Sequence, residues 1–441
     1  NLLSLREAIK NFHFPESTKK LEDAKNRFKF EELFYLEIIV ALRKKNYQIR
    51  LSGNSIAIKS KLVPTFLKTL PFKLTNAQLK VLSEIKSDML SEKPMNRLLQ
   101  GDVGCGKTII SLIAMLIAVD NGYQAAIMAP TEILADQHAK KISEMMKELY
   151  KQFNERKIKI SLLIGGQKKI ERDKRLREIE LQESDIIVGT HALFEEKVNY
   201  SNLGLVVIDE QHRFGVRQRA QLQSKSNQPD VLVMSATPIP RTLSLTLYGD
   251  LDVSVIDEMP KNRKPVKTVL RGDNKLPEIF KFISDKTRDG YQSFVVYPLV
   301  EESEKLELKA AETYYKELKT THLKNLKLGL IHGRMSWQEK EEKMILFLKK
   351  EFDVLISTTV IEVGIDIPDA NIILINDAHR FGLSQLHQLR GRVGRSSQQA
   401  YCILVSKDEF VKYKSKEYLN FEYISSSQLD KHKSAIRLQT M

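Results

Sequence analysis

The chain has 441 residues, of which 42% are hydrophobic, and a net charge of +14 at pH 7. A domain usually takes roughly 100–200 residues, so this length predicts two or three domains. No apolar run approaches the ~20 residues that a membrane helix needs. Asn1-Leu2-Leu3-Ser4 lacks the basic start of a secretory signal. We therefore expect no membrane partner, and the excess of cations favours a polyanion such as nucleic acid, because binding releases counterions.

The two cysteines, Cys105 and Cys402, lie far apart in the sequence and match no metal-ligand spacing. We expect buried or incidental thiols, and a disulfide between them is the less favoured alternative. Free thiols are typical of a reducing compartment, so we expect a cytoplasmic protein.

Residues 1–70 alternate helical patterns with charged stretches and contain no chemical motif. The run from Phe28 to Leu42 has apolar residues at helical spacing, and Arg43-Lys44-Lys45 after it suits the last turn of a helix. We expect a helical packing element, or a linker left from a larger N-terminal region.

From residue 71 onward, short apolar runs alternate with helical stretches, a pattern typical of α/β domains with parallel sheets. The expected strands are 97–100, 125–129, 185–188, 205–208 and 231–234, then 293–297, 328–331, 354–356, 372–375 and 400–405. Asn262-Arg263-Lys264-Pro265 between the two sets looks like a hinge. We predict one lobe over residues 71–262, a second over 263–410 and a basic tail over 411–441.

Residues 101–108 read GDVGCGKT and match the phosphate-binding pattern G-x-x-x-x-G-K-[ST], with an expected strand before it and a helix after it. The glycines of the pattern are Gly101, Gly104 and Gly106. They let backbone N–H groups face the phosphates of ATP, and the helix N-terminus adds partial positive charge. Lys107 would reach the β- and γ-phosphates, and the Thr108 hydroxyl would bind Mg²⁺. The flanking strand and helix argue against a chance match.

Further candidates for the nucleotide site lie on both sides of this loop. Asp209 and Glu210 follow the expected strand 205–208, and parallel strands deliver ligands at their carboxyl ends. We expect Asp209 to hold Mg²⁺ and Glu210 to orient and deprotonate the attacking water. An isolated Asp-Glu pair is more often a helix cap, but the upstream loop reverses that balance. Gln78 could read the adenine edge, with an exposed helical glutamine as the alternative.

The segment QLRGRVGR at residues 388–395 is the most informative part of the second half. Arg392 and Arg395 stand three residues apart, so one helical face can present both guanidiniums. Planar cations offset the charge that develops during phosphoryl transfer, so we expect two arginine fingers rather than a plain basic helix face. Upstream, Gly364 permits close backbone approach, and Asp366 could contact the ribose or the fingers.

Small-residue turns follow successive expected strands in both lobes, where a polymer backbone could lie. Backbone N–H groups and threonine hydroxyls suit phosphate contacts that fix position without reading sequence. Each turn alone is an ordinary loop, but their recurrence predicts a shared nucleic-acid track. The candidate contacts are Thr131, Gly166, Thr190, Arg334 and Thr358.

Together these residues resemble the motor of superfamily-2 helicases and, more narrowly, the RecG family of bacterial DNA helicases. The segments that carry the resemblance are 94–104, 128–135, 189–194, 209–216, 236–243 and 359–364. The motor of transcription-repair coupling factors looks similar, but the Glu-Gln-His order at 210–212 and the Thr-His-Ala-Leu-Phe run favour RecG.

The resemblance implies two tandem RecA-like lobes that close around ATP and Mg²⁺, in a monomer that translocates on duplex DNA. It also implies remodelling of branched DNA, such as stalled forks and Holliday junctions, in recombination and repair. We expect the chain to lack the family's wedge domain before Asn1, and its Gly-Pro-Gly segment and translocation hook after Val405.

Two other hypotheses stay open. A non-catalytic DNA-binding remnant is one, and the presence of Glu210, Arg392 and Arg395 argues against it. An RNA helicase is the other, because the Asp-Glu-Gln-His order at 209–212 does not exclude RNA. Stimulation of ATP hydrolysis by DNA junctions or by duplex RNA separates these hypotheses.

Overall fold

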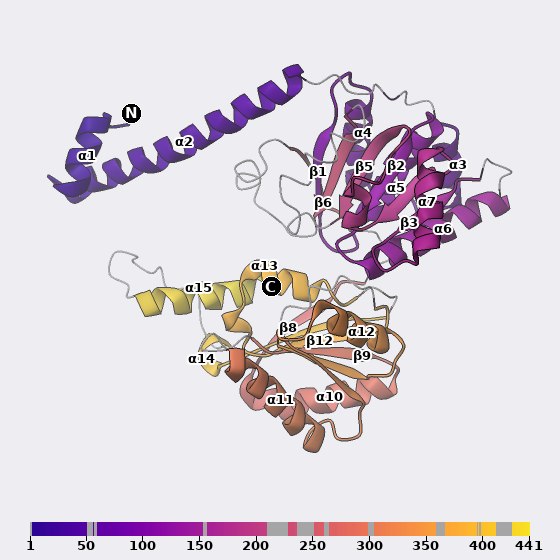
Figure 1. Cartoon of the computed structure of the whole chain (residues 1–441). Coiled ribbons are helices and arrows are strands. Elements are labelled where there is room, and N and C mark those ends of the chain that lie inside the picture. Colours follow the sequence, from indigo (N-terminus) through magenta and orange to yellow (C-terminus); the bar gives the residue numbers. More distant parts are fainter. Residues whose placement is uncertain are drawn as a thin grey trace.

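The computed structural model of the chain describes residues 2–50, 56, 60–152, 157–209, 228–235, 251–259, 264–298, 304–358, 367–394, 396, 398–411 and 426–441. These residues form an N-terminal helical arm and two α/β lobes (Figure 1). Among the helices described, none combines the length and apolar character needed to span a bilayer.

The described part of the first lobe is built on a parallel seven-stranded sheet in the order β3-β4-β2-β5-β6-β1-β7. The strands are β1 (Asn96–Gly101), β2 (Gln124–Met128), β3 (Ile160–Leu163), β4 (Ile186–Gly189), β5 (Leu203–Asp209), β6 (Asp230–Ser235) and β7 (Asp252–Ile256). The helices are α3 (Leu62–Thr69), α4 (Asn76–Met89), α5 (Lys107–Asp120), α6 (Glu132–Gln152) and α7 (Lys169–Glu180), with a short η1 (His191–Phe194). The central strands are fully buried because helices cover both faces.

Alternating side chains of each strand feed two hydrophobic clusters on opposite faces of this sheet. On β2, Ala125 and Ile127 join the cluster packed by α4, α5 and α6. Ala126 and Met128 join the cluster on the other face, with Ile179 from α7. Helix α5 is buried along almost its whole length, from Ile109 to Val119.

The second lobe repeats this plan with a sheet whose described strands run in the order β10-β11-β9-β12-β13-β8, all parallel. They are β8 (Lys267–Gly272), β9 (Gln292–Val296), β10 (Leu328–Ile331), β11 (Val354–Ser357), β12 (Ala370–Ile375) and β13 (Tyr401–Ser406). The helices are α10 (Leu276–Arg288), α11 (Glu304–Thr320), α12 (Trp337–Leu348), α13 (Leu383–Arg390), α14 (Asp408–Val411) and α15 (Ser426–Thr440), with short η3 (Asp273–Lys275) and η4 (Ala378–Arg380). Helices α12 and α13 lie on the side that faces the first lobe (Figure 1).

The predicted fold class, two parallel-sheet lobes preceded by a helical segment, is confirmed. Every strand expected from the sequence is present, but β3, β7 and β8 were not predicted. All three lie at the edges of their sheets, where polar side chains interrupt the apolar run that marks a buried strand. Of the expected hinge, residues 262 and 263 lie outside the described residues.

The ends of the chain are helical. Helices α1 (Leu5–His13) and α2 (Thr18–Arg50) pack against each other through Phe12 and Phe28, whose ring centroids lie 5.4 Å apart. Ile56 and α3 pack into the core of the first lobe. Ala435 and Leu438 of α15 likewise join the core of the second lobe. Both cores therefore draw on residues beyond the predicted ranges 71–262 and 263–410.

The two cysteines are free and buried in different lobes, as predicted. Burial raises the pKa of the Cys105 thiol and raises that of Cys402 to about 12. Neither thiol is therefore activated as a nucleophile.

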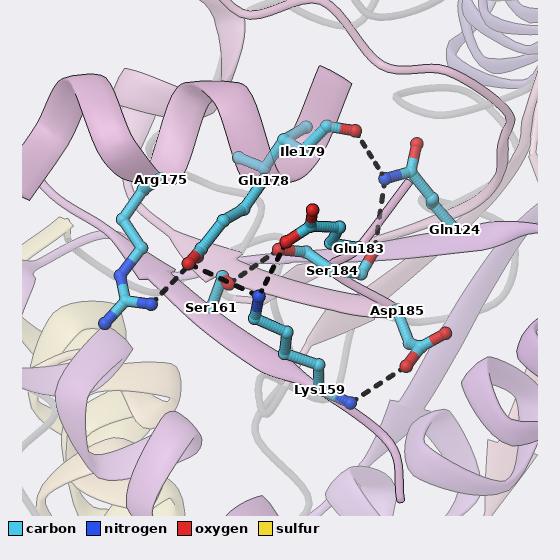
Figure 2. A network of polar contacts seen from close by, with 9 residues as sticks. All are labelled: Gln124, Lys159, Ser161, Arg175, Glu178, Ile179, Glu183, Ser184 and Asp185. Carbon is cyan, nitrogen blue, oxygen red and sulfur yellow. Dashed lines mark hydrogen bonds and ion pairs between the residues drawn. The ribbon is translucent and has the colours of Figure 1, made fainter. Parts of the chain in front are cut away.

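A polar network fixes edge strand β3 to its neighbours (Figure 2). Lys159 Nζ lies 3.3 Å from Glu178 on α7 and 3.1 Å from Glu183, and its backbone N–H donates to Asp185 at 2.8 Å. These bonds hold the N-terminal end of β3 against α7 and β4.

Candidate functional site

The sheet order brings the predicted nucleotide residues to one edge of the first lobe. Strands β5, β6 and β1 are neighbours. Asp209 at the end of β5 pairs with Met234, and Ser235 at the end of β6 pairs with Gln100, which precedes the phosphate loop. The predicted metal ligand and the predicted phosphate loop therefore lie at the same carboxyl edge, as parallel strands require.

The phosphate loop has the backbone geometry that its glycines allow. Gly104 and Gly106 take φ angles of 79° and 96°, in the left-handed region that favours glycine. Lys107 and Thr108 open α5, and Lys107 Nζ donates to the carbonyl oxygens of Gly101 and Asp102 at 2.7 and 3.0 Å. The ammonium therefore rests inside the curve of the loop, within reach of a phosphate that enters it.

Gln78 supports the phosphate loop through a buried hydrogen bond. Its side chain is 1% exposed, so the alternative of an exposed glutamine is wrong. Its Nε2 donates to the Cys105 carbonyl at 2.8 Å, and its Oε1 accepts from Thr75 N–H in a capping box. A Cβ atom on Gly106 would lie 2.3 Å from Gln78 Nε2, so any other residue would push the Gln78 amide away from the loop and would also strain φ. Recognition of adenine by Gln78 stays a prediction.

Asp209 is held by a residue that the sequence analysis missed. His138 Nε2 on α6 lies 2.8 Å from Asp209 Oδ2, and both side chains are largely buried. Among the described residues, no group of three or more His, Cys, Asp or Glu side chains could hold a metal alone. Mg²⁺ is commonly bound by one or two carboxylates together with phosphates and water, so a single Asp209 with the Thr108 hydroxyl suits that ion. Glu210 lies outside the described residues.

The second lobe reaches the phosphate loop through the end of α13. A Cβ atom on Gly391 would lie 2.7 Å from Val103 Cγ2, so the Gly391 backbone packs closely against the Val103 side chain. Arg390 Nη2 lies 3.8 Å from Asp102 Oδ2. The half-buried Arg392 follows Gly391 directly, so its backbone lies close to the phosphate loop.

The prediction that Arg392 lies on a helix face is wrong, because α13 ends at Arg390. Glycine is a poor helix former, and Gly394 takes a φ of 78° that a right-handed helix excludes. Arg392 lies in the turn beyond the helix. Arg395, Gly364 and Asp366 lie outside the described residues.

The predicted nucleic-acid contacts also collect at one edge of each sheet. Thr131, Gly166 and Thr190 follow β2, β3 and β4, which are neighbours in the first sheet. Arg334 and Thr358 follow β10 and β11, which are neighbours in the second. Each group of turns is therefore contiguous, as a shared track needs.

The hydrogen bonds of these turns differ. Thr131 Oγ1 accepts from Leu134 N–H, and Gly166 N–H donates to Glu132 at 3.0 Å. Thr190 is 2% exposed, and its hydroxyl finds no hydrogen-bond partner among the described residues. A buried hydroxyl without a hydrogen-bond partner lowers the stability of the folded state. Thr358 is buried and donates its N–H to Ile331, whereas Arg334 is exposed.

A second contact between the lobes lies at the N-terminus of α6. The N–H of Ile133 donates to Glu341 Oε1 of α12 at 3.3 Å, and the Ile133 side chain packs on the core of the second lobe. Burial, and then the neighbouring Glu132, raise the pKa of Glu341. A carboxylate at a helix N-terminus is a favourable pairing. The sequence gives no signal for Glu341, which lies 208 residues from its partner.

Comparison with known proteins defines the class first. Residues 75–246 match the DEAD/DEAH box helicase family, and residues 274–397 match the helicase conserved C-terminal domain. The solved structure of S. cerevisiae Dbp5 bound to RNA and ADP BeF3 is 20% identical. The similarity covers 79% of this chain and 88% of that chain with a TM-score of 0.54, which reflects a common fold. The chain has the two RecA-like lobes of the superfamily-2 helicases.

Within that class the similarity to one family is far higher. A solved structure of RecG bound to a three-way DNA junction is 45% identical, with a TM-score of 0.80 over 92% of this chain and 53% of that chain. The ATP-dependent DNA helicase RecG of Thermotoga maritima is 49% identical over 92% of this chain and 51% of its own length. That of Synechocystis sp. is 46% identical over 92% and 48%. The chain belongs to the RecG family and spans about half the length of these relatives.

Proposed function

We propose that this chain is the ATP-hydrolysing motor of a DNA helicase that translocates on duplex DNA and remodels branched DNA, such as stalled forks and Holliday junctions, in recombination and repair. The observation that carries the proposal is the close approach of Gly391 to Val103 of the phosphate loop. It supports a nucleotide site shared by two lobes, which is what a motor driven by ATP requires. The junction bound by the related RecG supports branched DNA as the substrate.

In this proposal each polar group of the site has one task. The loop N–H groups and Lys107 bind the β- and γ-phosphates. Thr108 and Asp209 hold Mg²⁺, which when bound neutralises charge on these phosphates. Glu210 orients the attacking water and takes its proton. Arg392 and Arg395 stabilise the charge on the equatorial oxygens in the transition state, a contribution of about 10³–10⁵ in kcat for arginine fingers.

The nucleic acid would lie across the other half of both sheets. Thr131, Gly166 and Thr190 in the first lobe, with Arg334 and Thr358 in the second, would contact phosphates without reading bases. The hydroxyl of buried Thr190, which has no hydrogen-bond partner among the residues that the structure describes, supports a ligand at this edge. Opening and closing of the lobes around ATP would then move one group of contacts relative to the other.

The test is ATP hydrolysis by the chain with and without DNA. We expect duplex and three-way junction DNA to stimulate turnover, and Lys107→Ala or Glu210→Gln to abolish it nearly completely while the fold persists. Lys286→Ala, on the outer face of the second lobe, is the matched control and should behave like the wild type. Turnover that neither DNA changes would refute a DNA motor.

Duplex RNA belongs in the same experiment, because the fold alone is shared with helicases bound to RNA. Stimulation by RNA equal to that by DNA junctions would favour the RNA helicase instead. We further propose that the protein is a cytoplasmic monomer that needs no membrane. Its two free, buried cysteines support the cytoplasmic location. Light scattering of the purified chain with and without DNA measures its oligomeric state.

A further inference from the structure

We propose that His138 is a positioning residue that transmits the binding of DNA at the N-terminus of α6 to Asp209, the predicted Mg²⁺ ligand. This inference rests on the proposed function. It concerns how nucleic acid raises the rate of ATP hydrolysis, which neither the phosphate loop nor the arginines explain.

The contact itself is well defined. His138 Nε2 lies 2.8 Å from Asp209 Oδ2, and the two side chains are 11% and 17% exposed. An ionised carboxylate only accepts hydrogen bonds, so Nε2 carries the proton and donates. A hydrogen bond of this kind to a metal ligand orients the ligand's remaining lone pairs. The position of His138 therefore determines the direction in which Asp209 meets Mg²⁺.

Helix α6 connects this contact to the predicted DNA track. Thr131, the residue that caps α6, lies seven residues before His138, which is close to two helical turns or about 10 Å along the axis. The two residues therefore lie on the same side of α6. Leu134, Ala135 and Ile142 on that side are buried in the first lobe's core. A helix packed in this way moves as a rigid body, so a shift at Thr131 displaces His138 as well.

The first turn of α6 is also where other elements meet. Glu132 accepts the N–H of Gly166, a second predicted DNA contact, at 3.0 Å. The N–H of Ile133 donates to Glu341 from the second lobe. DNA and the second lobe thus act on the same turn of the helix. His138 on the same helix contacts Asp209, so both signals can reach this hydrogen bond.

A purely structural histidine would behave differently. If His138 only filled space in the core, its loss would lower stability and leave the Mg²⁺ dependence of hydrolysis unchanged. If it positions Asp209, its loss changes the Mg²⁺ concentration that gives half-maximal rate and weakens the response to DNA. These two readouts separate the roles.

The experiment compares wild type, His138→Ala, His138→Gln and Lys140→Ala. Lys140 lies on the exposed side of the same helix, paired with Asp136, and is the matched control. ATP hydrolysis is measured with and without linear duplex DNA over a series of Mg²⁺ concentrations, and DNA affinity is measured by fluorescence anisotropy. Glutamine can place an N–H near the position of Nε2, so His138→Gln tests rescue of the hydrogen bond.

We expect His138→Ala to raise the half-saturating Mg²⁺ concentration by about tenfold, the lower end of the effect of losing such a bond. The DNA-stimulated kcat should fall by a similar factor, with DNA affinity and KM for ATP unchanged within twofold. His138→Gln should recover most of both losses, and Lys140→Ala should match the wild type.

The outcomes separate this inference from the proposed function. A wild-type chain that DNA fails to stimulate refutes the motor itself. A stimulated wild type with a His138→Ala variant of equal stimulation and equal Mg²⁺ dependence overturns the role of His138 and leaves the motor intact. If His138→Ala does not fold by circular dichroism, His138→Gln and the shorter His138→Asn decide. Equal Mg²⁺ dependence of that pair would overturn the inference.

Discussion

Asp230→Asn should make the first lobe more resistant to unfolding at alkaline pH. Asp230 opens β6 and is 3% exposed; its Oδ1 accepts from Met95 N–H at 2.6 Å, and its Oδ2 finds no partner among the described residues. Burial, helped by the nearby Asp88 carboxylate, raises the pKa of Asp230 from 3.8 to about 7. At pH 8 the folded lobe therefore holds a buried negative charge that asparagine lacks.

The size of the effect follows from the raised pKa. Protonation of Asp230 stabilises the folded state. This contribution to stability is complete below pH 3.8 and is lost as pH rises to about 7. One pKa unit corresponds to about 1.4 kcal/mol, so the wild type should lose about 2 kcal/mol between pH 5 and 7 through this group, and slightly more by pH 8. The asparagine side chain of the variant does not titrate. The stability advantage of the variant should therefore grow by about 3 kcal/mol from pH 5 to pH 8.

Urea unfolding followed by circular dichroism at both pH values measures the difference for the first-lobe transition. Asp173→Asn, on the exposed side of α7, is the control and should leave the pH dependence of the wild type unchanged. The comparison between pH values removes the fixed cost of burying the new amide group. If Asp230→Asn and the wild type lose stability in parallel between pH 5 and 8, Asp230 is not a buried acid and the reasoning is wrong.

Two further predictions concern the contacts between the lobes. Arg392→Ala should lower the DNA-stimulated kcat by about 10³-fold with little change in KM for ATP; an unchanged kcat would remove Arg392 from the site. Glu341→Ala should raise the affinity for duplex DNA several-fold in anisotropy titrations, because the Glu341 carboxylate occupies the helix N-terminus that a phosphate would use. Unchanged or weaker binding by Glu341→Ala would contradict that competition, and Glu342→Ala, the next residue of α12, serves as its control.

The sequence predicts the central strands of both sheets and the phosphate loop because their signals are local. Strands such as β2 and β12 are covered on both faces and therefore appear as continuous apolar runs. The loop combines fixed glycine spacing with a strand and a helix. Edge strands such as β8, with the sequence KTVLRG, carry no such run, because most of the strand is partly or fully exposed.

The contacts that connect the site could not be predicted, because they join residues far apart in the chain. His138 and Asp209 are 71 residues apart, and Ile133 and Glu341 are 208 apart. The position of Gln78 before the phosphate loop predicts a role at the nucleotide. Its hydrogen bond to the Cys105 carbonyl could not be predicted, because it depends on how α4 packs on α5. The end of α13 before Arg392 was missed because the helical spacing of Arg392 and Arg395 outweighed Gly391 and Gly394.

Ile133 and Gly391 together restrict how the two halves of the molecule can turn. Ile133 packs against the core of the opposite lobe, and Gly391 packs against Val103 at the phosphate loop. Two bodies that touch at two separate points, and keep both, can rotate only about the line that joins those points. As long as both contacts persist, the only rotation left to one lobe relative to the other is about that line, and the positions of Ile133 and Gly391 define the axis.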